Sequence, residues 1–163
     1  MRIREATEAD APQAAALWTE AYSGQGPGEG RTEPYGEGEL ALTAAAATVL
    51  VAESEQGEVV GIVALVPADS PRGALAEPGE AELSRLAIAA PARGRGIGRA
   101  LALRCLELAR EQGAARVVLW SRPYQVQAHS LYESLGFRRT PERDGRDRDG
   151  RRWVFTLGLD PSR

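Results

Sequence analysis

The stretch RGRGIGRALALRCLELARE, residues 93–111, sets three glycines among three arginines at the start of a leucine-rich helix. Glycine weakens a helix and neighbouring arginines repel one another, so this composition is unfavourable unless a negative group binds there. Without side chains at Gly94, Gly96 and Gly98, several backbone amides can point at one anion, and the helix N-terminus adds partial positive charge. The pattern predicts a phosphate or pyrophosphate site, with a plain glycine-rich turn on a basic surface as the alternative.

Two common phosphate-binding motifs are excluded by the same residues. A dinucleotide-binding G-x-G-x-x-G pattern would need glycine at Arg99 or at Leu101. A P-loop needs a lysine, and all 20 basic residues of the chain are arginines. The absence of lysine also excludes a lysine Schiff base.

Length and composition indicate one globular domain. The chain has 163 residues, of which 43% are hydrophobic and 26% charged. Its net charge of −3 argues against nucleic-acid binding and mildly favours a cationic substrate. The first thirty residues contain no apolar run long enough for a signal peptide or a membrane span, so we expect no membrane association and a cytoplasmic location.

The spacing of apolar residues predicts a strand, two helices, three strands, a helix, a strand, a helix and two final strands. The first helix follows Thr7 and carries Trp18 and Tyr22 on its apolar stripe. The expected strands are 2–7, 49–54, 59–66, 81–90, 115–121, 137–143 and 151–159, and the other helices are 40–49, 97–112 and 128–135. The strand-helix-strand unit at 81–121 should be parallel and right-handed.

Three features favour structural roles over chemistry. Cys105, the only cysteine, lies among helical apolar residues and is expected to be a buried small hydrophobe. His129, the only histidine, lies beside its helix's apolar stripe, which predicts a solvated position. The charged turn DGRDRDGRR, 144–152, hints at a calcium loop, but Gly145 and Thr156 stand where ligands belong, so we expect no metal and an exposed hairpin.

Two motifs resemble one family. Arg93-x-x-Gly96-x-Gly98, after LSRLAIAAPA, resembles the acetyl-CoA motif of the GNAT superfamily of N-acetyltransferases, and LYESLGF, 131–137, resembles the same family's second signature. The motifs lie in the family's order and separation. The resemblance implies an α/β fold with a mixed sheet of about seven strands, four helices and a central splayed parallel strand pair, as a single domain over 1–163.

The resemblance also implies how acetyl-CoA binds as cosubstrate. A bulge should splay the strand RLAI from its neighbour, its backbone should pair with the pantetheine arm, and an N–H near Leu86 or Ala87 should stabilise the thioester oxyanion. The family usually has asparagine at the position of Gln125, which is one methylene longer, so that contact stays open. The implied cosubstrate-binding residues are Leu86, Ala87, Ile88, Arg93, Gly94, Arg95, Gly96, Ile97, Gly98, Arg99 and Gln125.

Acetyl transfer to an amine requires loss of the ammonium proton, stabilisation of an oxyanion and departure of a thiolate. The match to LYESLGF implies that Tyr132 is the acid that protonates the thiolate, and the alternative is a core aromatic. Glu82 lies on the acetyl-CoA strand six residues before Ile88, where the histone acetyltransferase branch resembles this stretch and has its base. We expect Glu82 to act as base, often through a water, with a structural hydrogen bond as the alternative.

These observations together predict an N-acetyltransferase that moves an acetyl group from acetyl-CoA to a primary amine by direct attack through a tetrahedral intermediate. The acceptor is expected to be a small molecule or a peptide N-terminus, and a homodimer is possible. A non-catalytic acyl-CoA-binding module is the alternative. The acceptor should lie against residues 23–38 and 142–152, which carry Glu29, Glu33, Tyr35, Glu37, Asp144, Asp147 and Asp149.

Overall fold

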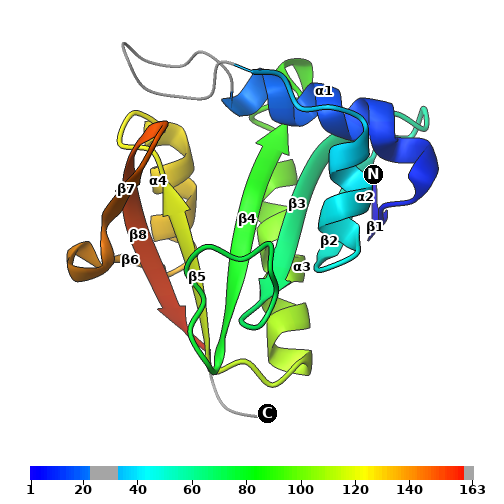
Figure 1. The fold of residues 1–163 in the computed structure, drawn as a ribbon. Helices are drawn as coiled ribbons and strands as arrows, with labels where there is room; N and C mark the ends of the chain where they lie inside the picture. Colours follow the sequence, from blue (N-terminus) through cyan, green and yellow to red (C-terminus); the bar gives the residue numbers. More distant parts are fainter. Residues whose placement is uncertain (23–32, 160–163) are drawn as a thin grey trace.

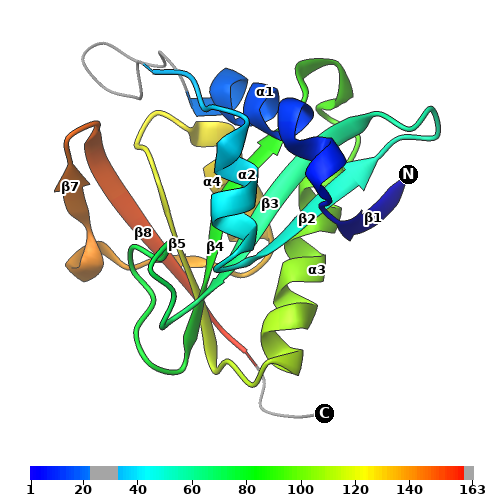
Figure 2. The ribbon, with the colours of Figure 1, turned by 45° about the vertical axis from the view of Figure 1, so that its right-hand side comes forward.

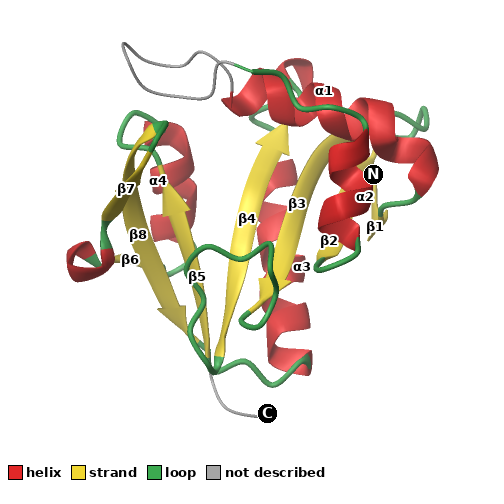
Figure 3. Ribbon diagram, in the orientation of Figure 1, coloured by secondary structure: helices red, strands yellow, loops and turns green. Residues whose placement is uncertain are grey.

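The computed structural model describes residues 1–22 and 33–159, so Glu29 lies outside the described residues. Figure 3 shows a central sheet with helices packed against it. The strands are β1 Arg2–Glu5, β2 Thr48–Glu53, β3 Val59–Pro67, β4 Glu80–Ile88, β5 Arg116–Ser121, β6 Arg138–Arg139, β7 Gly145–Asp147 and β8 Gly150–Gly158. The α-helices are α1 Ala11–Tyr22, α2 Gly38–Ala44, α3 Ile97–Glu111 and α4 Val126–Ser134, and short 3-10 helices span Glu8–Asp10, Ala90–Ala92 and Pro141–Arg143.

The sheet has the strand order β1-β2-β3-β4-β5-β8-β6, with β7 paired to β8 at one side. The pair β4–β5 is parallel, and the other pairs in the described residues are antiparallel. Helix α3 connects the two parallel strands, as the unit at 81–121 predicted. The mixed sheet and its four α-helices confirm the expected fold class.

Strands β4 and β5 separate soon after they begin. Their register covers only the three pairs from Glu80↔Arg116 to Glu82↔Val118. Beyond Glu82 the strands diverge and form a V in the middle of the sheet (Figure 1). The splayed parallel pair is therefore confirmed, and it opens the sheet at the carboxyl ends of two neighbouring strands.

Each face of the sheet carries its own apolar core. Helices α1 and α2 cover one face, where Trp18 and Leu40 pack on Val51 and Ile62. Helices α3 and α4 cover the opposite face through a second cluster of buried side chains (Figure 2). None of the described helices is both long and apolar enough to cross a bilayer.

The C-terminal part departs from the expected strands. The strand expected at 137–143 is reduced to Arg138–Arg139, because Pro141 lacks an N–H and a 3-10 turn follows. The charged turn itself contributes β7, which pairs with β8 from Gly145↔Arg152 to Asp147↔Gly150. The sheet therefore has eight strands where about seven were expected.

The prediction for His129 was wrong, whereas that for Cys105 is confirmed. Cys105 is fully buried, and burial raises the pKa of its thiol to about 12. The His129 ring is buried as well, because α4 packs on β8 over a wider face than its apolar stripe. The ring lies 5.6 Å from the Trp153 ring and 5.2 Å from the Phe155 ring, and Nε2 bonds the Arg122 carbonyl at 3.0 Å.

Candidate functional site

A cavity of about 1080 Å³ lies where β4 and β5 diverge. Its walls come from both strands, from α1 and α4, and from the turn before α3. Nearly all of the residues singled out from the sequence line it: Glu82, Leu86, Ala87, Ile88, Arg93, Gly94, Gly96, Ile97, Gly98, Arg99, Gln125 and Tyr132. Among the expected catalytic and cosubstrate-binding residues, Arg95 alone does not line the cavity.

The turn before α3 needs glycine for its backbone angles. Gly94 and Gly96 both have φ of +79°, and Gly96 is the N-cap of α3. A Cβ added at either position would meet nothing within 4 Å, so conformation and not crowding requires glycine there. The turn brings the first amides of a 15-residue helix to the cavity wall.

Two of the three arginines at this turn, Arg93 and Arg99, form hydrogen bonds with residues beside the cavity. Arg93 donates from Nε to the Ile88 carbonyl at 3.2 Å and lies 3.6 Å from Glu20. Arg99 donates from Nη1 to the Ser134 hydroxyl at 3.1 Å. Both side chains line the cavity and add positive charge beside the helix N-terminus.

Strand β4 carries a bulge beside the cavity. The register with β3 shifts between Ile62 and Ala64, and Arg85 and Leu86 have no partners in it. Arg85 has φ of +52°, which makes it the one described non-glycine residue with positive φ. The bulge confirms the irregularity that the resemblance implied for this strand.

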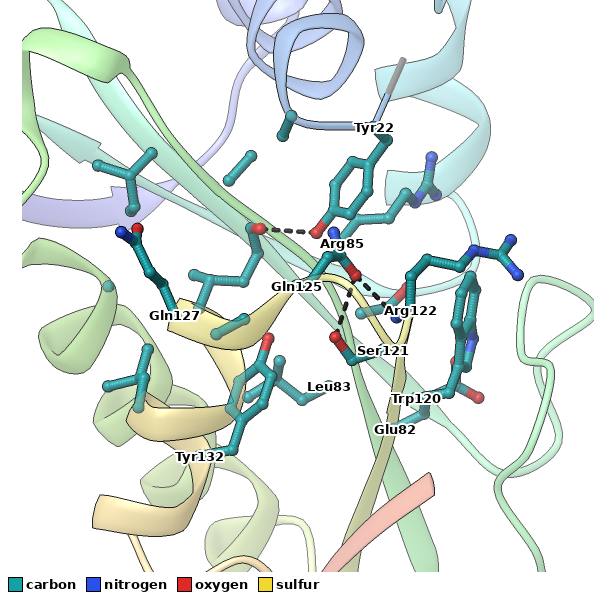
Figure 4. Close-up of a pocket in the computed structure, with 18 of the residues that line it drawn as sticks. Tyr22, Glu82, Leu83, Arg85, Trp120, Ser121, Arg122, Gln125, Gln127 and Tyr132 are labelled. Carbon is teal, nitrogen blue, oxygen red and sulfur yellow. Dashed lines mark hydrogen bonds between the residues drawn. The ribbon is translucent and has the colours of Figure 1, made fainter. Parts of the chain in front are cut away.

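Helix α1 donates hydrogen bonds to the carbonyls of the two bulge residues, Arg85 and Leu86. Trp18 donates from Nε1 to the Arg85 carbonyl at 3.1 Å. Tyr22 donates from its hydroxyl to the Leu86 carbonyl at 2.6 Å, and Figure 4 shows this bond beside the cavity. Burial raises the pKa of Tyr22 well above its usual value, so the phenol stays protonated and remains a donor. Sequence reasoning assigned both residues only to an apolar stripe.

The side chain of Arg85 fastens the bulge to α2. It donates to Glu39 Oε1 at 2.9 Å and to the Thr43 hydroxyl at 2.8 Å. Its guanidinium carbon lies 4.5 Å from the centroid of the Trp18 ring, within cation–π distance. Arg72, from the loop between β3 and β4, also pairs with Glu39.

Tyr132 enters the cavity from α4, on the side opposite to Tyr22 (Figure 4). Its ring meets Phe137 and Phe155 at centroid distances of 5.9 and 6.1 Å. Burial raises the pKa of its hydroxyl well above the usual value, and nearby Cys105 adds to the effect. The phenol is therefore protonated at neutral pH, and it has no hydrogen-bond partner among the described residues.

Glu82 is 1% exposed and supports the loop that follows β3. Its Oε1 accepts hydrogen bonds from the backbone N–H groups of Ala74 at 2.9 Å and Leu75 at 2.8 Å. Its Oε2 has no hydrogen-bond partner within 1–22 and 33–159. The carboxylate thus anchors the loop through one oxygen, and the residue still lines the cavity.

Gln125 closes the turn between β5 and α4. Its Oε1 accepts hydrogen bonds from the Ser121 hydroxyl at 3.0 Å and from the Arg122 N–H at 2.8 Å (Figure 4). The side-chain oxygen is therefore engaged in the turn, whereas the amide nitrogen has no partner in the part of the chain that the structure describes.

The far wall of the cavity contains a charged cluster that the sequence did not reveal. Arg122 forms a two-point ion pair with Asp147, with both distances 3.0 Å, and Arg152 donates to the same carboxylate at 2.9 Å. The guanidinium carbons of Arg122 and Arg152 lie 4.6 and 4.7 Å from the Trp120 ring centroid. Arg122 and Asp147 are 25 residues apart, so no local pattern could have identified the contact between the two halves of the cluster.

The expected acceptor wall is only partly present. Tyr35, Asp147 and Asp149 line the cavity, whereas Glu33, Glu37 and Asp144 do not. Asp144 instead pairs with Arg139 at 2.7 Å.

Curated relatives align over about half of the chain. N-acetyltransferase family 8 member 2 of Rattus norvegicus is 42% identical over 90 residues, which are 55% of this chain and 38% of that protein. N-acetylaspartate synthetase of Danio rerio is 40% identical over 87 residues, which are 53% of this chain and 28% of that protein. The chain thus matches less than two fifths of the length of either relative.

Solved structures match nearly the whole chain. A ribosomal-protein-alanine N-acetyltransferase from Brucella melitensis superposes with a TM-score of 0.76 and 26% identity, covering 98% of this chain and 100% of that one. A GNAT phosphinothricin acetyltransferase from Sinorhizobium meliloti, solved in complex with acetyl-CoA, gives a TM-score of 0.76 at 22% identity, covering 97% and 88%. At that identity the second match shows the shared fold alone.

The family model described as "Acetyltransferase (GNAT) family" matches residues 12–137. That range contains all but the first residue of α1, the splayed strands, the glycine-arginine turn and Tyr132. The match covers well over half of the chain and agrees with both motifs in the sequence. The chain belongs to the GNAT family of acetyltransferases.

Proposed function

We propose that residues 1–163 form one catalytic domain that transfers the acetyl group of acetyl-CoA to a primary amine. The observation that carries the proposal is one cavity lined by the glycine-arginine turn, by Glu82 and by Tyr132. An anion-binding turn and two proton-transfer groups in one space are what acetyl transfer from a pyrophosphate-bearing thioester requires.

The cosubstrate would lie along the open edge of β4. Amides of residues 94–99 and the N-terminus of α3 would bind the pyrophosphate, with Arg93 and Arg99 supplying charge. The pantetheine arm would follow the backbone at Leu86 and Ile88. The Ile88 carbonyl already accepts a bond from Arg93, which supports an approach of the arm through the N–H group there.

Protons would move through two buried residues. Glu82 would accept the proton of the attacking ammonium, through a water, since one carboxylate oxygen is engaged with the loop and the other is without a described partner. Tyr132 would donate its proton to the departing thiolate, since its ring lines the cavity and its hydroxyl carries a proton at neutral pH. The N–H of Leu86 would stabilise the oxyanion of the tetrahedral intermediate.

The acceptor would be a small molecule or a peptide N-terminus with a primary amine. Acidic and basic side chains both line the far wall, where Asp147 and Asp149 lie near Arg122. The similar proteins have names as different as ribosomal-protein-alanine N-acetyltransferase and N-acetylaspartate synthetase, which supports the amine class without a single acceptor.

A turnover screen tests the proposal. Purified protein is incubated with acetyl-CoA and a panel of amines, amino acids and peptides, and release of the CoA thiol is followed. We expect at least one amine to give steady release and an acetylated product by mass spectrometry. Acetyl-CoA binding without turnover on any amine would favour the acyl-CoA-binding module instead, and absence of binding would reject both functions.

A further inference from the structure

One turn of α1 provides donors to two consecutive carbonyls of β4. Trp18 and Tyr22 are four residues apart and therefore lie on the same face of the helix. Trp18 Nε1 lies 3.1 Å from the Arg85 oxygen, and the Tyr22 hydroxyl lies 2.6 Å from the Leu86 oxygen. Both residues are without a register partner on β3, so α1 supplies donors where the pairing of β4 with β3 is interrupted.

The bond from Trp18 to the Arg85 carbonyl also sets the direction of the Leu86 N–H, because the peptide unit is planar. The Arg85 carbonyl and the Leu86 N–H belong to one trans peptide unit, in which they point in opposite directions. A donor that fixes the Arg85 oxygen therefore fixes the direction of the Leu86 N–H. The Leu86 carbonyl shares its peptide with the N–H of Ala87, a residue that is in register with Ile62.

We propose that Trp18 is a positioning residue for acetyl transfer. Its indole N–H, acting through the peptide between Arg85 and Leu86, aims the Leu86 N–H at the thioester oxygen and polarises it. This inference rests on the proposed function, because Leu86 serves as oxyanion donor only there. A hydrogen bond to the carbonyl end of a peptide strengthens the donor at its other end, so the indole would contribute to the stabilisation of the oxyanion.

The indole is held rigidly enough for this role. Trp18 is fully buried, so water does not compete for its N–H. The guanidinium carbon of Arg85 lies 4.5 Å from its ring centroid, and that guanidinium is fixed in turn by Glu39 and Thr43. These contacts hold Arg85 at a φ of +52°, an angle that a non-glycine residue keeps only when its surroundings impose it. The donor geometry is therefore set before the cosubstrate binds, which is the condition for effective oxyanion stabilisation.

Isotope-edited infrared spectroscopy of bound acetyl-CoA tests the role directly. With carbon-13 in the thioester carbonyl, a hydrogen bond to the oxygen lowers the stretching frequency relative to free acetyl-CoA. Trp18→Phe keeps an aromatic ring and removes the indole N–H. Tyr22→Phe is the matched control, because it removes the neighbouring bond from α1 while leaving the peptide of the Leu86 N–H with its donor. Spectra are taken without acceptor, so contacts to the amine do not contribute.

The proposal expects the wild-type complex to show the lowered frequency, Trp18→Phe to lose most of that shift and Tyr22→Phe to retain it. Trp18→Phe should lower kcat by about tenfold, the ordinary effect of one hydrogen bond, while the acetyl-CoA Kd stays within about twofold. Trp153→Phe, a second indole deletion in β8 away from β4, should change neither quantity. If Trp18→Phe does not fold, benzothienylalanine at position 18 keeps the bicyclic shape without the N–H.

The results that would contradict the role of Trp18 differ from those that would contradict the proposed acetyltransferase function. A wild-type shift that persists in Trp18→Phe, or in the benzothienylalanine protein, overturns the role of Trp18 and leaves the acetyltransferase function intact. Bound acetyl-CoA with an unshifted carbonyl in the wild type overturns the oxyanion assignment of Leu86 and this inference with it. A wild-type protein that does not bind acetyl-CoA overturns the proposed function itself.

Discussion

Gly96 and Gly113 stand at opposite ends of α3 with nearly the same left-handed backbone angle, φ of +79° and +82°. A Cβ added at either position would meet nothing within 4 Å. Any side chain introduced at these two sites should therefore carry a similar conformational strain, of about 1–2 kcal/mol. Only Gly96 lines the cavity, so the pair separates a loss of ligand binding from a loss of stability.

Replacing Gly96 with glutamate should abolish the rise in Tm that acetyl-CoA gives the wild type. The new carboxylate would occupy the space before α3 and repel the pyrophosphate, and a ligand stabilises a protein only by binding its folded state. Gly113→Glu should lose a comparable amount of stability without ligand and keep the full acetyl-CoA shift. Thermal melts with and without acetyl-CoA measure both, and a normal shift in Gly96→Glu would remove the pyrophosphate assignment.

Tyr132→Phe should lower kcat by about 10²-fold while acetyl-CoA binding persists. Phenylalanine keeps the ring contacts with Phe137 and Phe155 and removes only the hydroxyl that would protonate the thiolate. Steady-state kinetics, a melt and an acetyl-CoA titration together make the measurement. Near-normal turnover would show that Tyr132 is a core aromatic.

Glu82→Gln should change the dependence of turnover on pH. The amide oxygen can still accept the bonds from Ala74 and Leu75, but the side chain no longer accepts a proton. We expect lower turnover at neutral pH and partial recovery at high pH, where more of the amine is already neutral. A profile that matches the wild type in shape and height would reduce Glu82 to a support of the loop.

Glu80→Gln is the matched control for that experiment. Glu80 is buried two residues earlier on the same strand, where it pairs with Arg116 at 3.0 Å and Arg143 at 2.9 Å. Loss of its charge should lower the Tm, because Arg116 and Arg143 lose the buried carboxylate that they share, and should leave the shape of the pH profile unchanged.

His129 should make the folded protein lose stability as the solution is acidified. Burial lowers the pKa of its imidazole below the usual value of about 6.5. Below that pH the unfolded chain takes up a proton that the folded protein binds more weakly, so the free energy of unfolding falls by up to about 1.4 kcal/mol per pH unit. Above about pH 7 the imidazole is neutral in both states and contributes no pH dependence.

His129→Gln removes this titration, since an amide N–H can replace the imidazole as donor to the Arg122 carbonyl. His129 is the only histidine, and carboxylates titrate mainly below pH 5. Melts between pH 7.5 and pH 5.5, a window chosen about the usual histidine pKa of ~6.5, should therefore show a falling Tm in the wild type and a flatter curve in the variant. If Tm falls with pH equally steeply in the wild type and in His129→Gln, a group other than His129 is responsible for the loss of stability.

The order of the elements and the nature of the turn at 93–99 could be predicted from the amino-acid sequence. Apolar residues at helical or alternating spacing depend only on near neighbours, so they predicted the strands before and after α3 and the amphipathic course of that helix. Gly94 and Gly96 were informative for the same reason, because a left-handed angle is a local property that few other residues adopt. The strand expected at 137–143 was wrong beyond Arg139, whereas the hairpin expected at the charged turn is present as β7 and the start of β8.

The contacts between side chains around the cavity follow only from the tertiary fold. Trp18 and Arg85 are 67 residues apart, Tyr22 and Leu86 are 64 apart, and Arg122 and Asp147 are 25 apart. The residues next to Trp18 and Tyr22 in the chain do not distinguish a hydrogen-bond donor to a bulged strand from an ordinary core aromatic. Their roles arise because β4 separates from β5 after Glu82 and bulges away from β3 at Arg85 and Leu86, so that side chains from elsewhere in the fold contact this part of the strand.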